Sequence, residues 1–252
     1  MNQLINIRLS TSGEEFLICN YLTLSRSPQN DLINFKFYGV QRLKNIAIHN
    51  TIINLTITFC NNKNEWTFFN EFEIVVLRSE IDFSKHMEWS VIGTMRNVDE
   101  FEYIHRRMEV FNMWQKKVVF DWFSLPINSP LKLDYISACM IYSGLGMKMI
   151  DRDFYSFDVS LIKEERDFNY LSGVEFIGER GYFGHDLHTY KDCLLEIVLH
   201  NDYFYGRRVI LKNFHRIYNS EIASYFADMR KVLLDYKFTV IIEEGNAINS
   251  AG

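Results

Sequence analysis

Long apolar runs are missing from this chain of 252 residues. No stretch reaches the roughly 18 consecutive apolar residues that predict a membrane-spanning helix. The first eight residues also lack the basic segment and apolar core of a secretory signal. These absences argue against a membrane protein and a secreted protein, so we expect a cytoplasmic protein that does not bind membranes.

Cysteine and proline are scarce as well. The four cysteines, Cys19, Cys60, Cys139 and Cys193, lie among apolar neighbours and never in C-x-x-C spacing. We therefore expect reduced, buried thiols and neither a disulfide framework nor a thiolate metal site. Two of the three prolines fall in residues 124–130, which we interpret as a turn or an internal linker.

Recognisable catalytic and cofactor motifs are also absent. The sequence contains no G-x-x-x-x-G-K-[ST], H-E-x-x-H or G-x-S-x-G pattern. Gly144-Leu-Gly146 is too short for a nucleotide-binding fingerprint. His188 and His200 lie more than about three turns apart on one predicted helix, which is too far to share a metal ion. We expect neither an enzyme nor a protein that binds a cofactor or a metal.

What the chain does contain is typical of a globular protein, with 48% hydrophobic and 23% charged residues. Its length allows one large domain or two of ordinary size. Residues 1–152 hold 16 basic and 16 acidic residues, whereas residues 153–252 hold 11 and 16. All of the net charge of −5 thus lies in the second part, which favours a basic partner over direct binding of nucleic acid.

Residues 1–152 have a strand-rich pattern. Apolar and polar residues alternate in 33–37 and 53–59, as they do in half-buried strands. The polar stretch 61–64 then precedes apolar segments within 66–76, which predicts a hairpin.

One helix is predicted in this part. Asn97 and Glu100 have the spacing of a capping box. Apolar residues follow at helical spacing, at Phe101, Ile104, Met108 and Phe111. We therefore expect a β-rich N-terminal domain with at least one packed helix, and its role is open.

The apolar segment 135–149 and the charged residues after it place the domain boundary between residues 152 and 153. Beyond that point strands and helices alternate, which implies crossover connections and a small parallel sheet. Predicted strands are 157–162, 208–211 and 238–242; predicted helices are 167–177, 187–200, and one that Ser220 caps and that contains Ile222, Phe226, Met229 and Leu233. The expected fold class is an α+β chain of two domains, 1–152 and 153–252.

The most distinctive segment is Gly181-Tyr-Phe-Gly-His-Asp-Leu-His-Thr-Tyr-Lys-Asp-Cys-Leu194, a glycine-aromatic loop that leads into a helix. The two glycines permit backbone conformations that other residues avoid. Apolar residues at 187, 190, 194 and 197 share one helix face, which we expect to be buried. His188 and Asp192 lie one turn apart on another face, beside Lys191. A carboxylate displayed on a rigid helix can enter a pocket built to hold phosphate.

This segment resembles the binding loop and second helix of the barstar family, whose members inhibit barnase-type ribonucleases. Tyr182-Phe183-Gly184 stands at the family's aromatic pair and glycine, and Asp192-Cys193-Leu194 at its Asp-Cys-Leu. The resemblance extends over residues 154–244, roughly 90 of the 252 residues. It implies a three-stranded parallel sheet with packed helices, and the partner-binding residues Tyr182, Phe183, Gly184, His185, Asp186, His188, Lys191, Asp192 and Glu196.

The chain also departs from the family. His188 stands where members commonly have a second acidic residue, Lys191 where they have Trp, and Asp186 where they have Asn. Arg230 and Lys231 occupy the region where the last helix of the family carries an acidic residue. These departures argue against barnase itself as the target.

The resemblance implies an immunity protein, an antidote that occludes the basic active-site cleft of a toxic nuclease delivered by a competing bacterium. Asp192 would mimic the phosphate of the substrate. Simpler interpretations stay open: Asp192 as a solvated carboxylate, Tyr182 as a structural residue, and Asp186 as only a helix cap. An alternative function is an enzyme or ligand-binding protein whose activity lies in residues 1–152, with a regulatory barstar-like domain.

Overall fold

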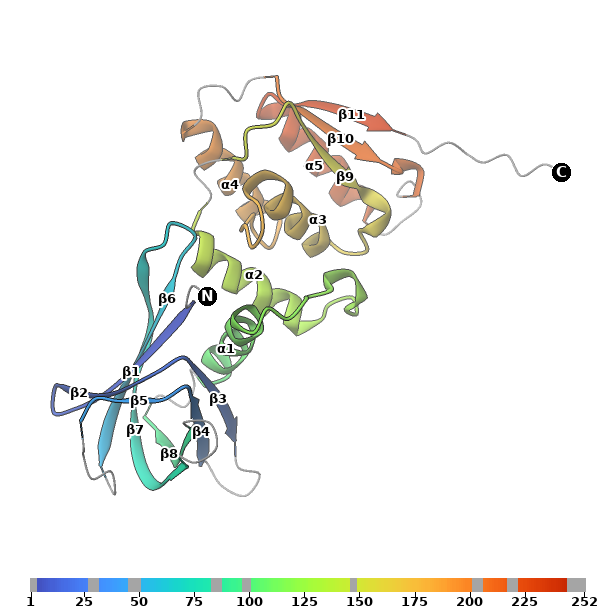
Figure 1. The fold of residues 1–252 in the computed structure, drawn as a ribbon. Coiled ribbons are helices and arrows are strands. Elements are labelled where there is room, and N and C mark those ends of the chain that lie inside the picture. The colour runs from blue at the N-terminus through green and yellow to red at the C-terminus, as the bar shows by residue number, and fades with distance from the viewer. Residues whose placement is uncertain are drawn as a thin grey trace. The chain divides into compact units, whose positions relative to one another are not determined.

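The computed structural model describes residues 4–26, 32–44, 51–82, 88–96, 101–145, 149–200, 206–216 and 222–243. Residues 1–120 and 121–252 form two compact units (Figure 1). The sequence pattern predicts the division after residue 152. In the structure, residues 121–152 group with the second unit. No helix in the described ranges is long and apolar enough to cross a membrane.

The first unit contains an eight-stranded antiparallel sheet with the strand order β3-β4-β8-β7-β6-β1-β2-β5. The predicted hairpin is confirmed, since β6 and β7 pair and residues 61–65 connect them. The strands are β1 (Ile5–Thr11), β2 (Glu14–Cys19), β3 (Tyr21–Arg26), β4 (Ile33–Tyr38), β5 (Gln41–Arg42), β6 (Ile52–Cys60), β7 (Trp66–Asp82) and β8 (Glu88–Met95).

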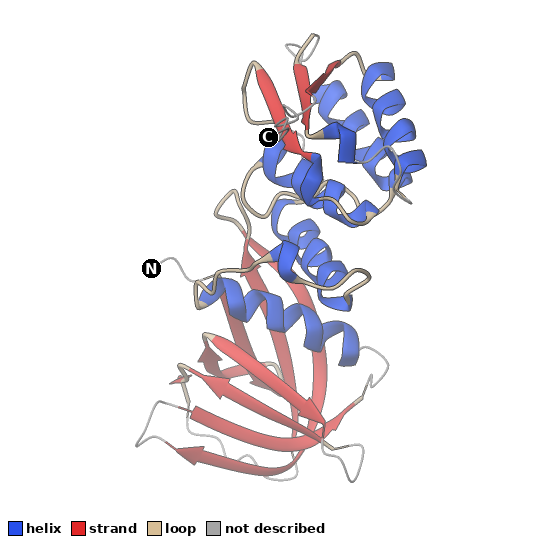
Figure 2. Cartoon of the chain, turned by 90° about the vertical axis from the view of Figure 1, so that its right-hand side faces the viewer, coloured by secondary structure: helices blue, strands red, loops and turns tan. Residues whose placement is uncertain are grey.

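One face of this sheet forms the core of the first unit. Side chains alternate between buried and half-buried positions along β6 and β8, as the period of a strand requires. Helix α1 (Phe101–Gln115) packs on the buried face (Figure 2). Phe111 stacks on Phe59 with 5.4 Å between ring centroids, and Asn112 Nδ2 donates a hydrogen bond to Leu22 O at 2.7 Å. The predicted cap at Asn97 and Glu100 lies outside the described residues.

The second unit contains a three-stranded parallel sheet, as predicted, and its strand order is β11-β10-β9. Figure 2 shows its helices gathered beside the strands. The predicted cap at Ser220 lies outside the described residues. The elements are a 3₁₀ turn (Trp122–Ser124), α2 (Pro130–Ser143), β9 (Phe154–Asp158), α3 (Glu165–Ser172), α4 (Leu187–His200), β10 (Arg208–Lys212), a 3₁₀ turn (Phe214–Arg216), α5 (Ala223–Asp235) and β11 (Thr239–Glu243).

Two elements differ from their predicted bounds by more than one residue. Strand β9 ends at Asp158 and not at residue 162, because the Asp158 side chain accepts a hydrogen bond from Ser160 N and begins a 3₁₀ turn. Helix α3 begins at Glu165, two residues before the prediction. After Ser172 it continues as a π-helical turn, Gly173–Ile177.

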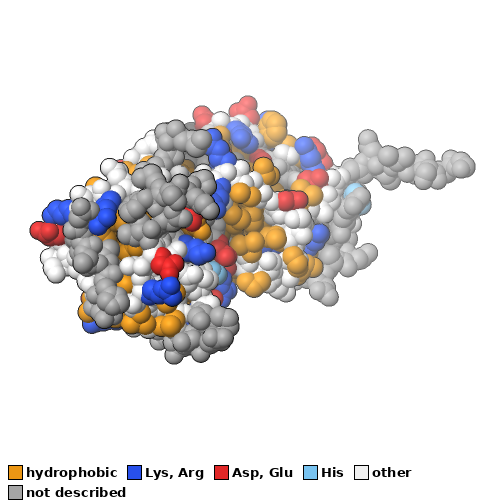
Figure 3. Space-filling model, turned by 60° about the horizontal axis from the view of Figure 1, so that its bottom comes forward, with side chains coloured by type: hydrophobic (Ala, Val, Ile, Leu, Met, Phe, Trp, Pro, Cys, Tyr) orange, Lys and Arg blue, Asp and Glu red, His pale blue; other side chains and the backbone are white. Residues whose placement is uncertain are grey.

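Both units expose some large hydrophobic side chains, including Trp66, Phe68 and Leu199. Figure 3 shows hydrophobic side chains lying among charged ones on one face of the molecule. More than half of a folded protein's surface is ordinarily contributed by apolar atoms. A single exposed apolar side chain therefore does not mark a site.

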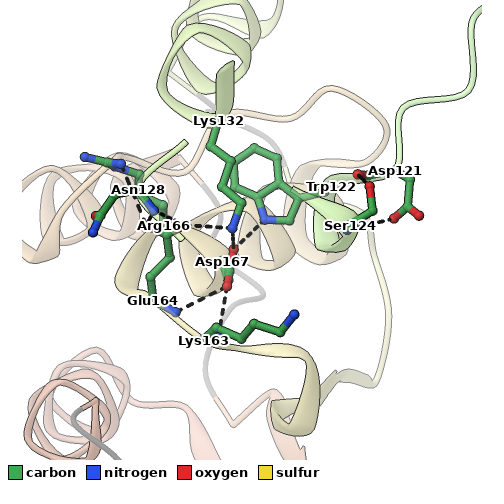
Figure 4. Close-up of polar contacts among 9 residues, drawn as sticks. All are labelled: Asp121, Trp122, Ser124, Asn128, Lys132, Lys163, Glu164, Arg166 and Asp167. Carbon is green, nitrogen blue, oxygen red and sulfur yellow. Dashed lines mark hydrogen bonds and ion pairs between the residues drawn. The ribbon is translucent and has the colours of Figure 1, made fainter. Parts of the chain in front are cut away.

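A buried network of charges ties the beginning of the second unit to α3 (Figure 4). The Lys132 ammonium is 2.7 Å from Glu164 and 2.8 Å from Asp167, and all three residues are buried. Asp167 Oδ1 also accepts a hydrogen bond from Trp122 Nε1 at 2.6 Å, and the Glu164 carboxylate accepts one from Asn128 N. Because a buried charge is costly without partners, residues 122–132 are fixed to α3.

Candidate partner-binding site

The loop before α4 is held by close backbone contacts. A Cβ atom on Gly173 would lie 2.2 Å from Gly181 O, and one on Gly181 would lie 2.3 Å from Gly173 O. Gly184 has φ +82°, and a Cβ atom there would lie 2.6 Å from Tyr190 N. Side chains at these positions would collide with backbone atoms, so the glycines let the loop pack against α3 and α4.

Tyr182 and Phe183 belong to the core and not to the surface. Their exposed fractions are 4% and 1%. The Phe183 ring lies 4.8 Å from that of Tyr190 between centroids, and burial raises the pKa of Tyr182 to about 12. The resemblance implies that these side chains and Gly184 contact a partner; in the structure all three are buried, and they shape the loop.

Asp186 caps α4, as one interpretation of the sequence proposed. Its Oδ1 accepts a hydrogen bond from Thr189 N at 2.8 Å, while Thr189 Oγ1 accepts one from Asp186 N at 3.2 Å. This reciprocal pair is a capping box with threonine in the third position. The bond from Thr189 N lowers the pKa of the Asp186 carboxyl, which stays 47% exposed.

Asn169 on α3 also fixes the start of α4. In the amide orientation that satisfies all its neighbours, Oδ1 accepts hydrogen bonds from His185 N at 3.1 Å and Asp186 N at 2.9 Å. Its amide nitrogen then donates to the Tyr225 hydroxyl at 2.7 Å on α5. Sequence reasoning did not identify Asn169, because no local pattern links it to a loop 16 residues later.

The two faces of α4 differ as the spacing predicted. Tyr190, Leu194 and Ile197 are fully buried, although Leu187, expected on the same face, is only partly buried. The opposite face brings together the predicted residues His188, Lys191, Asp192 and Glu196; the first three are exposed and Glu196 is partly buried. The glutamate lies 3.6 Å from His200. Leu195 and Leu199, which are not among the predicted contact residues, are also exposed on this helix.

The cysteines and histidines form no metal site in the part of the chain that the structure describes. All four cysteines are free thiols. Cys19, Cys139 and Cys193 are buried, as expected, whereas Cys60 is only partly buried. Burial raises the pKa of the Cys193 thiol to about 12, so it is neutral and unreactive beneath the outer face of α4.

A groove of about 600 Å³ lies beside the start of α4. It is lined from four helix starts: the turn before α2, the first turn of α3, His185 and Asp186 before α4, and Ile222 before α5. In the first unit, a smaller hollow of about 370 Å³ lies on the polar face of the sheet, with Lys36, Arg78 and Glu80 in its lining.

Comparisons with protein-family models, with curated proteins and with solved structures found no match to this chain. The resemblance to the barstar family rests on the residues of the loop, of α4 and of the parallel strands.

Proposed function

We propose that this protein is an immunity protein that binds and neutralises a bacterial toxin, a ribonuclease, by occluding its active site. One observation carries the proposal: Asp192 is exposed on a helix whose opposite face is locked into the core by Tyr190, Leu194 and Ile197. The order of strands and helices around it, with a three-stranded parallel sheet, agrees with the resemblance.

The position of Asp192 suits the binding of a basic cleft. A carboxylate on a rigid helix loses little freedom when it binds, so more of the attraction contributes to affinity. Charge-assisted bonds from arginine, lysine or histidine in a phosphate-binding pocket are the strong kind of hydrogen bond. The excess negative charge of residues 153–252 would guide such a partner to this surface.

The burial of the loop changes which residues we assign to the contact. We assign it to the outer residues His185, Asp186, His188, Lys191, Asp192 and Glu196, while Tyr182, Phe183 and Gly184 shape the loop behind them. Inhibition by occupancy requires neither a chemical step nor a cofactor. We therefore propose a protein that is not an enzyme, and whose ligand is the toxin and not the nucleic acid that the toxin cleaves.

Co-purification with the product of the neighbouring gene, followed by a ribonuclease assay with and without this protein, tests the proposal. Asp192→Asn should weaken toxin binding at least ten-fold and leave the thermal midpoint unchanged, because the residue is exposed and stabilises only the complex. Asp228→Asn is the matched control, since Asp228 is an exposed carboxylate on α5. Equal toxin affinity of the two variants would contradict the proposal.

A second candidate places a ligand-binding or catalytic activity in residues 1–152, with a regulatory second part. The hollow with Lys36, Arg78 and Glu80 is the observation that favours it, since ionisable groups converge there. Arg78 and Glu80 form an exposed ion pair with each other. Toxin neutralisation that persists in a Lys36→Ala, Arg78→Ala double variant would separate the proposed inhibition from this candidate.

A further inference from the structure

The groove beside the start of α4 combines an apolar wall with carboxylates. Its volume of about 600 Å³ is that of a site for a large side chain or a small ligand. On one side lie Ile127 and Leu133, whose exposed fractions are 55% and 38%, with Ile222 nearby. The lining also includes Glu165 and Asp186, which are exposed and partly exposed.

Among the described residues, neither of these two carboxylates forms an ion pair with a lysine or an arginine. Glu164 accepts hydrogen bonds from Lys132 and Asn128, and Arg166 lies 3.7 Å from it, so this part of the lining is internally balanced. Figure 4 shows the Lys163 side chain extending away from Asn128 and Arg166. Lys163 also lines the groove, and His185 Nε2 is 3.4 Å from Asp186 Oδ2.

Asp186 is also held in place. Its Oδ1 is bonded to Thr189 N and Thr189 Oγ1 at 2.8 Å each, and Thr189 Oγ1 in turn accepts from the backbone before α4. The carboxylate therefore keeps one orientation, and its Oδ2, which lies beside His185, can accept a further hydrogen bond. A fixed acceptor favours a ligand with a planar, directional donor over a spherical charge.

We infer that this groove receives an arginine side chain of the partner, with its aliphatic stem against Ile127 and Leu133 and its guanidinium at Glu165 and Asp186. Arginine joins a long apolar stem to a planar cationic head, and the groove offers both surfaces. The identity of the partner rests on the proposed function, but binding of an arginine side chain does not. The groove adds a second anchor point at the start of the helix that carries Asp192.

A capped tripeptide tests the groove without the toxin. Acetyl-Gly-Arg-Gly-amide is titrated into the full chain labelled at isoleucine and leucine methyl groups. The Ile127 and Leu133 methyl signals should shift and saturate with a dissociation constant of about 1–10 mM, typical of one side chain in an open groove. The norleucine peptide, which keeps the stem, should bind at least five-fold more weakly.

Variants assign the effect to the carboxylates. Glu165→Gln combined with Asp186→Asn should weaken the arginine peptide at least five-fold, and asparagine still caps the helix. Asp228→Asn, on α5, should leave the affinity unchanged. The inference is overturned if the two methyl signals do not respond, or if acetyl-Gly-Asp-Gly-amide binds as tightly as the arginine peptide. Neither result touches the proposed function, which Asp192→Asn tests with the toxin itself.

Discussion

The charged groups inside the second unit and those on the outer face of α4 are held in opposite ways. Inside, Lys132 is shared by Glu164 and Asp167, and the backbone and Trp122 supply further bonds to the two carboxylates. Outside, His188, Lys191 and Asp192 stand exposed on a helix that the core holds rigid. The first arrangement fixes the fold. The second leaves charge available to a partner, so substitutions in the two sets should affect different measurements.

The largest effect is expected from Lys132→Met. Removal of the ammonium leaves two carboxylates buried without their cation, which should lower the free energy of unfolding by about 3–5 kcal/mol in urea denaturation. Arg8→Met is the matched control, because Arg8 and Glu15 form an ion pair at 3.1 Å on the surface of the first unit. Arg8→Met should lower the free energy of unfolding by no more than about 1 kcal/mol. Similar losses for both variants would show that burial does not set the difference.

The second largest effect is expected from Gly184→Val, which should lower the free energy of unfolding by about 2 kcal/mol or more. Its φ of +82° disfavours a β-branched side chain, and the added Cβ atom would also meet Tyr190 N at 2.6 Å. Gly206→Val separates the two causes, since Gly206 has φ +80° but no atom within 4 Å of an added Cβ. Gly206→Val should lower the free energy of unfolding by less than Gly184→Val does. Toxin neutralisation by a normally folded Gly184→Val variant would remove the loop geometry from the account of binding.

Asp186→Ala should lower the free energy of unfolding by about 1 kcal/mol, because the backbone N–H and the hydroxyl of Thr189 both lose their acceptor. Asp186→Asn should retain most of the stability, since asparagine caps equally well. The lowered pKa of Asp186 gives a sign to the pH dependence. Its contribution is fully present above the ordinary carboxyl value of about 4 and is lost as the pH falls through the lowered folded value. Thermal midpoints of wild type and Asp186→Ala should therefore converge in acid; parallel curves would contradict the assignment.

How far the sequence predicts this molecule depends on how local the responsible interactions are. Periodicity placed α4 and the inward Tyr190, Leu194 and Ile197 correctly, because a helix face is set by neighbours a turn apart. The parallel sheet followed from the alternation of strands and helices. The fold class, a β-rich part followed by a part with alternating strands and helices, was predictable on the same grounds.

Long-range contacts explain what the sequence could not show. The burial of Tyr182 and Phe183 depends on α3 and on the close approach of Gly173 to Gly181, which no local pattern encodes. The grouping of residues 121–152 with the second unit depends on Lys132 meeting carboxylates more than 30 residues away. In the sequence Lys132 looks like an ordinary surface lysine. A single buried lysine becomes informative only when its partners are known.

The smallest effect concerns the rate of association with the toxin. Exposed charges are screened over about 10 Å at 0.1 M salt, so the on-rate should fall as the ionic strength rises while the off-rate changes little. Asp192→Asn and Asp228→Asn each remove one negative charge from the second unit. Both should therefore lower the on-rate by a similar factor of about two at low salt, measured by stopped flow.

The off-rate separates a charge in the contact from a charge in the general field. Removing a carboxylate that is desolvated against a cation in the complex speeds dissociation. Removing a distant carboxylate changes only the rate of encounter. Asp192→Asn should raise the off-rate at least five-fold, and Asp228→Asn should leave it unchanged. Equal off-rates would mean that Asp192 acts only through long-range attraction, and that the main contact lies elsewhere. An on-rate that is independent of salt would exclude steering by charge and leave the fit of the two surfaces as the source of affinity.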